Sequence, residues 1–256
     1  MIALLSPAKN LDFETAPTTQ QFTQPDFQKE SEHLIKKLSK LSKKKVAALM
    51  DLSDNLAALN HERYQTWELP FEPNNAKQAA FAFNGEVYTG LAIETFSEKD
   101  IQYAQSHLRI LSGLHGLLRP LDLIQPYRLE MGTSFSAKPS QKNLYQFWGS
   151  KIAQRINQDL VEQGDDVIIN LASTEYFKAV DLKKLKAQVI NCHFKERKGD
   201  DYKIVMVFAK KARGMMASYI IKNQISNPED LKQFNIDNYL FNANLSSEKD
   251  WVFTRG

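Results

Sequence analysis

The sequence predicts a mixed α/β (α+β) fold in which helices flank a central mixed sheet. Two short apolar runs, residues 2–5 and 166–172, are expected to be buried strands. Apolar side chains at helical spacing predict a long amphipathic helix over residues 144–163. Residues 188–194 and 203–208 alternate enough to form two antiparallel strands joined by a charged turn.

The remaining elements follow from capping residues and periodicity. Ser97 is placed to cap a helix over residues 97–110, with Asp100 at its third position. In a helix over 53–64, Leu56, Leu59 and Arg63 share one face. Further helices are expected at residues 29–40, at 43–50 and from 210 onward, strands at 79–83 and within 122–132, and a hairpin from 239–244 and 251–255.

Composition places the chain among ordinary globular proteins. Its 256 residues are 43% hydrophobic and 25% charged, enough to build one large domain or two small ones. The apolar runs are too short to span a membrane, and the N-terminus lacks the basic start of a signal peptide. Cys192 is the only cysteine, which excludes an internal disulfide and fits a reducing cytoplasm.

Positive charge is concentrated in two segments, although the net charge of the chain is only +3. Residues 181–223 hold 11 Lys/Arg against 4 Asp/Glu, and residues 29–45 hold 7 Lys against 2 Glu. The rest of the chain is therefore net negative. This asymmetry indicates a basic face for a polyanion, and the alternative is a pair of solvated helix faces.

Residues 111–120, Leu-Ser-Gly-Leu-His-Gly-Leu-Leu-Arg-Pro, carry the sharpest local signal. Gly113 and Gly116 follow an expected helix, as in the helix-hairpin-helix of DNA-binding proteins. Glycines there let backbone N–H groups approach a phosphate. The alternatives are a tight turn between packed elements, or a strand-turn-strand over residues 109–118. Pro120 favours these, because any following helix must begin near Leu117.

Polar residues follow several of the expected strands. Lys9 is a candidate anion ligand in the loop after the first strand. Arg128 and Glu130 fall on one face of a short strand, as an ion pair or as an anion-holding arginine braced by a carboxylate. Ser173, beside Glu175, is expected to cap a short helix, and catalysis is the alternative. No Gly-x-Ser-x-Gly elbow surrounds it.

Several common sites are missing from the sequence. There is no Walker loop, no His-Glu-x-x-His and no dinucleotide-binding Gly-x-Gly-x-x-Gly after a strand. The five histidines show no metal-ligand spacing. We therefore expect neither a metal site nor a cofactor. Lys210 and Arg213 share a face at the start of a helix, where cations oppose the helix dipole and a phosphate would relieve that cost.

The chain resembles the YaaA family of bacterial peroxide-stress proteins over almost its whole length. The matching segments, in order, are residues 5–9 (LSPAK), 11–12 (LD), 84–91 (NGEVYTGL), 111–122 (LSGLHGLLRPLD), 125–132 (QPYRLEMG), 144–149 (LYQFWG), 169–173 (INLAS), 175–177 (EYF) and 210–214 (KKARG).

The resemblance implies one domain over residues 1–256, of unusual mixed α/β fold, with a positively charged cleft and a helix-hairpin-helix element. It implies binding to double-stranded DNA and a role in hydrogen peroxide stress, in which the family lowers unincorporated iron. The family's hairpin corresponds here to Gly113, Leu114 and Gly116. His115 stands where the family commonly has Tyr, so binding is expected to vary with pH. From charge and motif position, we assign the cleft contacts to Lys9, Arg119, Arg128, Lys210, Lys211 and Arg213.

Two functional hypotheses follow. The first is a cytoplasmic DNA-binding stress protein, expected as a monomer with no membrane partner. The second is an enzyme of unknown reaction on an anionic or nucleic-acid substrate in the same cleft. Its candidate catalytic residues are Glu130, Ser173 and Glu175, with Glu130 as general acid or base. Direct iron sequestration ranks third, because ligand spacing is absent.

Overall fold

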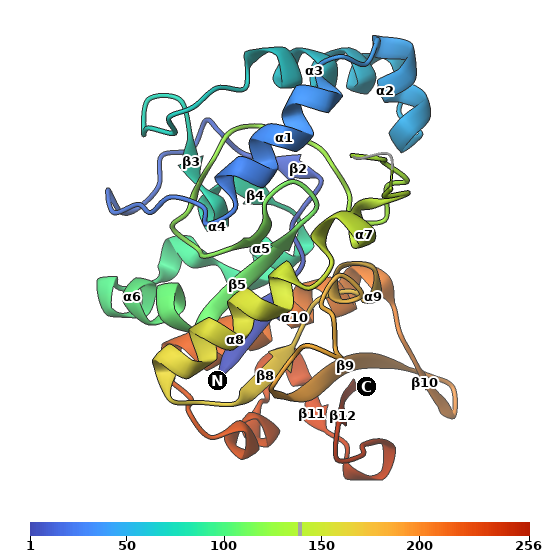
Figure 1. Cartoon of the computed structure of the whole chain (residues 1–256). Coiled ribbons are helices and arrows are strands. Elements are labelled where there is room, and N and C mark those ends of the chain that lie inside the picture. The colour runs from blue at the N-terminus through green and yellow to red at the C-terminus, as the bar shows by residue number, and fades with distance from the viewer. Residues whose placement is uncertain (138–139) are drawn as a thin grey trace.

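The central element is a mixed sheet of eight strands, seen in a computed structural model that describes residues 1–137 and 140–256 (Figure 1). Its order is β11-β12-β9-β8-β1-β5-β6, and β10 pairs with β9. The mixed α/β prediction is confirmed. The strands span Ile2–Leu5 (β1), Leu108–Ser112 (β5), Gly116–Leu118 (β6), Val167–Asn170 (β8), Gln188–Lys198 (β9), Asp201–Lys203 (β10), Leu240–Phe241 (β11) and Asp250–Arg255 (β12).

The strand β1 lies at the centre of the sheet, parallel to β5 on one side and to β8 on the other. All four of its side chains are buried. A parallel strand covered on both faces needs an unbroken apolar run, which is why residues 2–5 could be assigned from sequence. β8 is in turn parallel to β9, and β9 to β12. The C-terminal hairpin is confirmed by the antiparallel pairing of β11 with β12.

Helices pack around this sheet and above one end of it (Figure 1). The capping box expected at Ser97 is present, since Ser97 and Asp100 bond to each other's backbone N–H groups. Two-residue strands form the pairs β2–β4 (Asn10–Leu11, Phe83–Asn84) and β3–β7 (Lys77–Gln78, Leu123–Ile124). The helices are α1 (Gln28–Leu38), α2 (Lys43–Met50), α3 (Asp54–Thr66), α4 (Ala79–Ala82), α5 (Glu86–Leu91), α6 (Glu98–His107), α7 (Leu144–Trp148), α8 (Lys151–Gln163), α9 (Thr174–Phe177) and α10 (Met206–Lys222), with short 3-10 turns at 93–95, 228–233, 236–238 and 243–245.

Four element predictions need correction. The helix expected over 97–110 ends at His107, and β5 begins at Leu108 because this segment enters the buried centre of the sheet. The helix expected over 144–163 is two helices, interrupted at Gly149 with φ of 50°. Residues 79–82 form the short helix α4 where a strand was expected. The second strand of the 188–208 pair ends at Lys203, and α10 begins at Met206.

A buried ion network ties β5 to α8. Arg109 Nε donates to Asp159 Oδ2 at 2.7 Å, and Arg155 Nη2 lies 2.6 Å from Asp159 Oδ1. The side chains of Arg109 and Asp159 are 6% and 0% exposed. A charged pair this deep is tolerated because each charge has an ionic partner, and Arg109 Nη1 also donates to the carbonyls of Gln105 and Leu108. Within the described residues, no helix is long and apolar enough to cross a bilayer.

Candidate functional site

The parallel strands β1 and β8 end at the same edge of the sheet, and the segments that follow them meet there. Ser6 comes directly after β1, and Ser173 comes shortly after β8. Ser173 N donates to Ser6 Oγ at 2.9 Å, and the two hydroxyl oxygens are 3.3 Å apart. Ser173 is the N-cap residue of α9, but its side chain makes no capping bond. Ligands commonly bind at the carboxyl ends of parallel strands, so this edge is the natural place for a site.

A carboxylate shared by two cations lies at this edge. Lys9 Nζ is 2.7 Å from Glu130 Oε2, and Arg128 Nη2 is 3.0 Å from Glu130 Oε1. The Lys9 side chain is 61% exposed, whereas those of Arg128 and Glu130 are 15% and 21% exposed. The ion pair expected between Arg128 and Glu130 is confirmed, whereas anion binding by Arg128 stays a prediction. The structure therefore brings Lys9, Arg128 and Glu130 together from segments about 120 residues apart.

Glu175, on α9, also lies at this edge. Its Oε1 accepts from Gly132 N at 2.9 Å, two residues after Glu130. Tyr176 is buried, and burial raises the pKa of its phenol well above the usual value, with Glu175 and Glu130 adding to the effect. Glu175 therefore anchors the Glu130 segment to α9. The three residues proposed as catalytic, Glu130, Ser173 and Glu175, all belong to this edge.

The Gly113–Gly116 turn does not form a helix-hairpin-helix. β5 and β6 pair antiparallel around it, with Ser112 opposite Gly116, so the strand-turn-strand alternative is correct. A side chain at Gly113 would clash with the backbone of Leu129 and Glu130. Gly113 therefore lets the Glu130 segment pack directly on the turn. The turn therefore supports the Glu130 segment. Its own residues are buried, so its backbone N–H groups are not available to a phosphate.

The other turn residues are also buried. Gly116 has φ of 68°, and a Cβ there would lie 2.6 Å from the Trp148 ring. Leu114 and His115 are 0% exposed. Burial lowers the pKa of His115 to about 3, so its ring is neutral at physiological pH. The expectation that His115 titrates near neutral pH and contacts DNA is therefore wrong.

Arg119 is held by ion pairs and a hydrogen bond within the protein. It lies 3.0 Å from Asp122 Oδ1 and 3.7 Å from Asp26 Oδ1, and its Nη2 donates to the Gln24 carbonyl at 2.8 Å. The Asp122 side chain is only 1% exposed, and burial raises the pKa of its carboxyl. Arg119 neutralises that buried carboxylate. The structure thus corrects its assignment as a free cation of the cleft.

The three α10 cations assigned to the cleft, Lys210, Lys211 and Arg213, lie outside the first turn of the helix where they were expected, because α10 begins at Met206. Lys210 and Lys211 are exposed, while Arg213 is partly buried and its Nε has no hydrogen-bond partner among the described residues. Burial lowers the pKa of Arg213. α10 crosses α5 at close range, because Gly90 and Gly214 leave no side chain between the two backbones. Among the described residues, no ion pair joins α10 to Lys9, Arg128 or Glu130.

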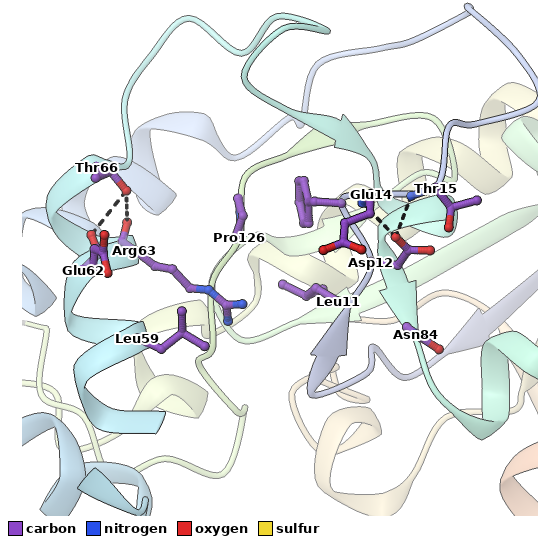
Figure 2. A pocket seen from close by; sticks show the side chains of 11 residues that line it. Leu11, Asp12, Glu14, Thr15, Leu59, Glu62, Arg63, Thr66, Asn84 and Pro126 are labelled. Atoms are coloured by element: carbon purple, nitrogen blue, oxygen red, sulfur yellow. Dashed lines mark hydrogen bonds between the residues drawn. The ribbon is translucent and has the colours of Figure 1, made fainter. Parts of the chain in front are cut away.

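Arg63 is a residue that the sequence did not single out as functional. It projects from α3 into a surface cavity of about 640 Å³ that Leu11, Glu14 and Pro126 also line (Figure 2). Burial and the nearby Arg128 both lower the pKa of Arg63. Its neighbour Tyr64 donates a hydrogen bond to the Arg128 carbonyl, which fixes α3 against the segment that carries Glu130. The sequence did hold one signal for Arg63, because it is a cation at helical spacing from Leu56 and Leu59, on a face that is otherwise apolar.

Exposed lysines cover the helices next to this cavity. α2 and α3 form a helical hairpin that turns at Asp51, whose φ is 50°, at the end of the molecule away from β11 and β12 (Figure 1). Of the seven lysines between residues 29 and 45, Lys36 pairs with Glu32 at 2.8 Å, and the other six form no ion pair with a described residue. The basic surface of the 29–45 segment consists of Lys29, Lys36, Lys37, Lys40, Lys43, Lys44 and Lys45, all exposed.

No cluster of three or more His, Cys, Asp or Glu side chains in the described ranges, 1–137 and 140–256, is placed to hold a metal ion. Cys192 is buried, and burial raises the pKa of its thiol to about 12. The thiol is therefore protonated at physiological pH. The chemistry available at the site comes from carboxylates, hydroxyls and cations.

Comparisons with known proteins point to one family. The family model described as "Peroxide stress protein YaaA" matches residues 1–245. A curated relative, a UPF0246 protein of Cellvibrio japonicus, is 51% identical over 255 residues, which cover 100% of this chain and 98% of the relative.

Proposed function

Because the chain belongs to the YaaA family of peroxide stress proteins, we propose that it binds double-stranded DNA during the response to hydrogen peroxide. The observation that carries the proposal is the run of exposed lysines from Lys29 to Lys45, over α1 and the start of α2, beside the cavity at Arg63 on α3. The groove between Lys43 and Leu59 and the Arg63 cavity share Leu59 and Glu62, so the two surfaces adjoin. Unpaired lysines on such a surface attract phosphates.

The contacts in this proposal differ from those first assigned. The α2–α3 hairpin replaces the Gly113–Gly116 turn, and Lys43, Lys44 and Lys45 supply the phosphate contacts at the start of α2. Lys9 and Arg128 extend the same surface, because Arg128 is close enough to Arg63 to lower the pKa of Arg63. Contacts of this kind position a duplex without reading bases.

The test is a salt titration of duplex binding followed by fluorescence anisotropy. Simultaneous Lys43→Ala, Lys44→Ala and Lys45→Ala substitutions should weaken binding to every sequence similarly. The slope of log affinity against log salt should fall by about 0.9 for each lysine that contacts a phosphate. Lys183→Ala, Lys184→Ala and Lys186→Ala remove the same charge from exposed lysines elsewhere and serve as the matched control. Equal effects of the two triple variants, or no binding at low salt, refute the proposal.

We further propose that the protein acts in the cytoplasm and limits oxidative damage by lowering unincorporated iron; this part rests on the family resemblance alone. Electron paramagnetic resonance of intact cells measures that iron pool. A deletion strain should show a larger pool after peroxide, and the wild-type gene should restore it. Complementation by the α2 triple-lysine variant tells whether DNA binding is needed for the effect.

A second candidate function is catalysis on an anionic or nucleic-acid substrate at the strand edge. It is favoured by Glu130, a partly buried carboxylate that two cations hold in place beside the Ser6–Ser173 hydroxyl pair. Glu130 would serve as general acid or base, with Lys9 and Arg128 binding the anion. Incubation with labelled DNA, compared with Glu130→Gln, tests this. Turnover that survives Glu130→Gln removes Glu130 from that role, and absence of any product removes DNA as the substrate.

A further inference from the structure

The cavity at Arg63 has the features of a small-molecule site as well as a place on the DNA-binding surface. Its volume of about 640 Å³ lies within the range of pockets that hold drug-sized ligands, roughly 300–1,000 Å³. It lies between α3 and the segment from Leu11 to Thr15 (Figure 2). Neither Lys9 nor Glu130 lines it, so it is distinct from the strand edge.

Arg63 gives this cavity an unpaired cation. Its one hydrogen bond, from Nη1 to Asn60 Oδ1, is 3.3 Å long, and no carboxylate among the described residues forms an ion pair with it. The side chain is partly buried, and a second cation, Arg128, is near enough to disfavour its charge. A phosphate accepts two parallel hydrogen bonds from a guanidinium and would relieve both effects.

The remaining walls suit an aromatic base. Leu11, Phe13, Leu59 and Pro126 supply apolar and aromatic surface, and the Asn84 amide supplies hydrogen-bonding groups. Bases bind proteins by stacking on such surfaces, with polar groups that contact the base edge. The cavity therefore combines one phosphate ligand with a surface for a base.

Three carboxylates line this cavity, those of Asp12, Glu14 and Glu62, and they narrow the choice of ligand. Asp12 already accepts hydrogen bonds at 2.9 Å from Glu14 N and Thr15 N, and these bonds, with Lys77 nearby, keep its pKa near 2. Glu14 is exposed and lies on the wall opposite Arg63 (Figure 2). A carboxylate there repels additional phosphates and accepts from N–H donors. It therefore favours a monophosphate and a base with adjacent donors, of which guanine has two.

We propose that this cavity binds one nucleotide, with its phosphate against Arg63 and its base toward Phe13 and Glu14. The nucleotide comes either from solution, as a free nucleoside monophosphate, or from an unpaired position in a DNA strand. Only the second source rests on the proposed DNA binding.

Isothermal titration calorimetry with dGMP tests the free nucleotide. We expect one site per chain, weaker binding of dGTP and of dTMP, and at least about tenfold loss in Arg63→Ala. Glu14→Gln should reduce the preference for dGMP over dTMP. Arg197→Ala, on an exposed part of β9, is the matched control and should bind as the wild type does. Phe13→Leu, which removes the stacking surface, provides a second variant if thermal melting shows that Arg63→Ala is unfolded.

Anisotropy with a duplex that carries one unpaired guanosine, compared with the fully paired duplex, tests the second source. A gain of at least about fivefold for the unpaired site, lost in Arg63→Ala, assigns the nucleotide to the strand. Duplex binding without any dGMP binding or bulge preference overturns the nucleotide site and leaves the proposed function intact. Binding of dGMP without duplex binding overturns the proposed function and leaves the nucleotide site intact. Equal affinity of the wild type and Arg63→Ala for dGMP also overturns the site.

Discussion

Lys9 Nζ lies 2.7 Å from Glu130 Oε2, and Arg128 occupies the other oxygen of the same carboxylate. Two cations therefore share the Glu130 carboxylate at the exposed edge of the sheet, where Glu175 also lies. Arg63, which has no ion-pair partner in the described chain, lines the neighbouring cavity. The Glu130 carboxylate competes with any phosphate that approaches Lys9 and Arg128.

Glu130→Gln should strengthen duplex binding by roughly three- to tenfold at low salt, because it releases two cations and removes a repulsive charge. The effect should shrink as salt rises. Anisotropy at two salt concentrations measures it. Glu229→Gln removes an exposed carboxylate, paired with Lys232, from the 228–233 turn and is the control. Equal effects of the two variants would show that duplex DNA does not contact this edge.

Arg119→Ala should lower stability and leave duplex affinity within about twofold. Loss of Arg119 leaves the buried Asp122 carboxylate without its cation. Removing one partner of a buried ion pair costs about 3 kcal/mol, and less where solvent screens the pair. Urea denaturation measures the free energy of unfolding. A large loss of DNA affinity in a folded Arg119→Ala protein would return this residue to the binding surface.

Gly113→Ala should be more destabilising than Gly199→Ala. The Cβ at Gly113 would meet the Leu129 and Glu130 backbone, and such overpacking costs about 1–3 kcal/mol or more. Gly199 has φ of 65° but open space around it, so alanine there costs only about 1 kcal/mol. Comparing the two urea midpoints separates crowding from backbone strain. A Gly113→Ala protein as stable as the wild type would contradict the packing of the turn under Glu130.

His115 should influence stability in acid and leave DNA binding unchanged between pH 6 and 8. Its folded pKa of about 3 lies below the ordinary value of 6.5, so between these values the unfolded chain binds the extra proton. Its contribution to stability is complete above pH 6.5 and is lost as pH falls toward 3, by up to about 1.4 kcal/mol per pH unit.

The His115 prediction is checked by the free energy of unfolding at several pH values in wild type and His115→Gln. The variant should lose part of the slope below pH 6.5, whatever its stability at neutral pH. Identical slopes would mean that the pKa of the ring is the same in the folded and unfolded chains. A duplex affinity that changes between pH 6 and 8 in wild type but not in the variant would restore His115 to the interface.

Much of the secondary structure could be predicted from local sequence. The apolar run of β1, the capping box at Ser97 and the α2 boundaries each depend on residues within a few positions of one another. The strand edge was also partly predictable, because Lys9, Ser173 and Glu175 follow strands that turned out to be parallel. Arg128 and Glu130 form the expected ion pair, but the strand expected to carry them is wrong, because β7 ends at Ile124.

The sequence alone determined several of the central elements, β1, β8 and α2 among them, and which polar residues follow β1 and β8, since periodicity and capping act over a few residues. Only the tertiary structure decided that the glycine turn is buried under Glu130, that Arg119 serves Asp122, and that Arg63 faces a cavity. Burial and ion pairing depend on neighbours such as Glu130 and Lys9, which are remote in sequence. The same two-glycine sequence fits an exposed hairpin and a buried turn equally well. Only the packing of the surrounding chain decides which of the two forms.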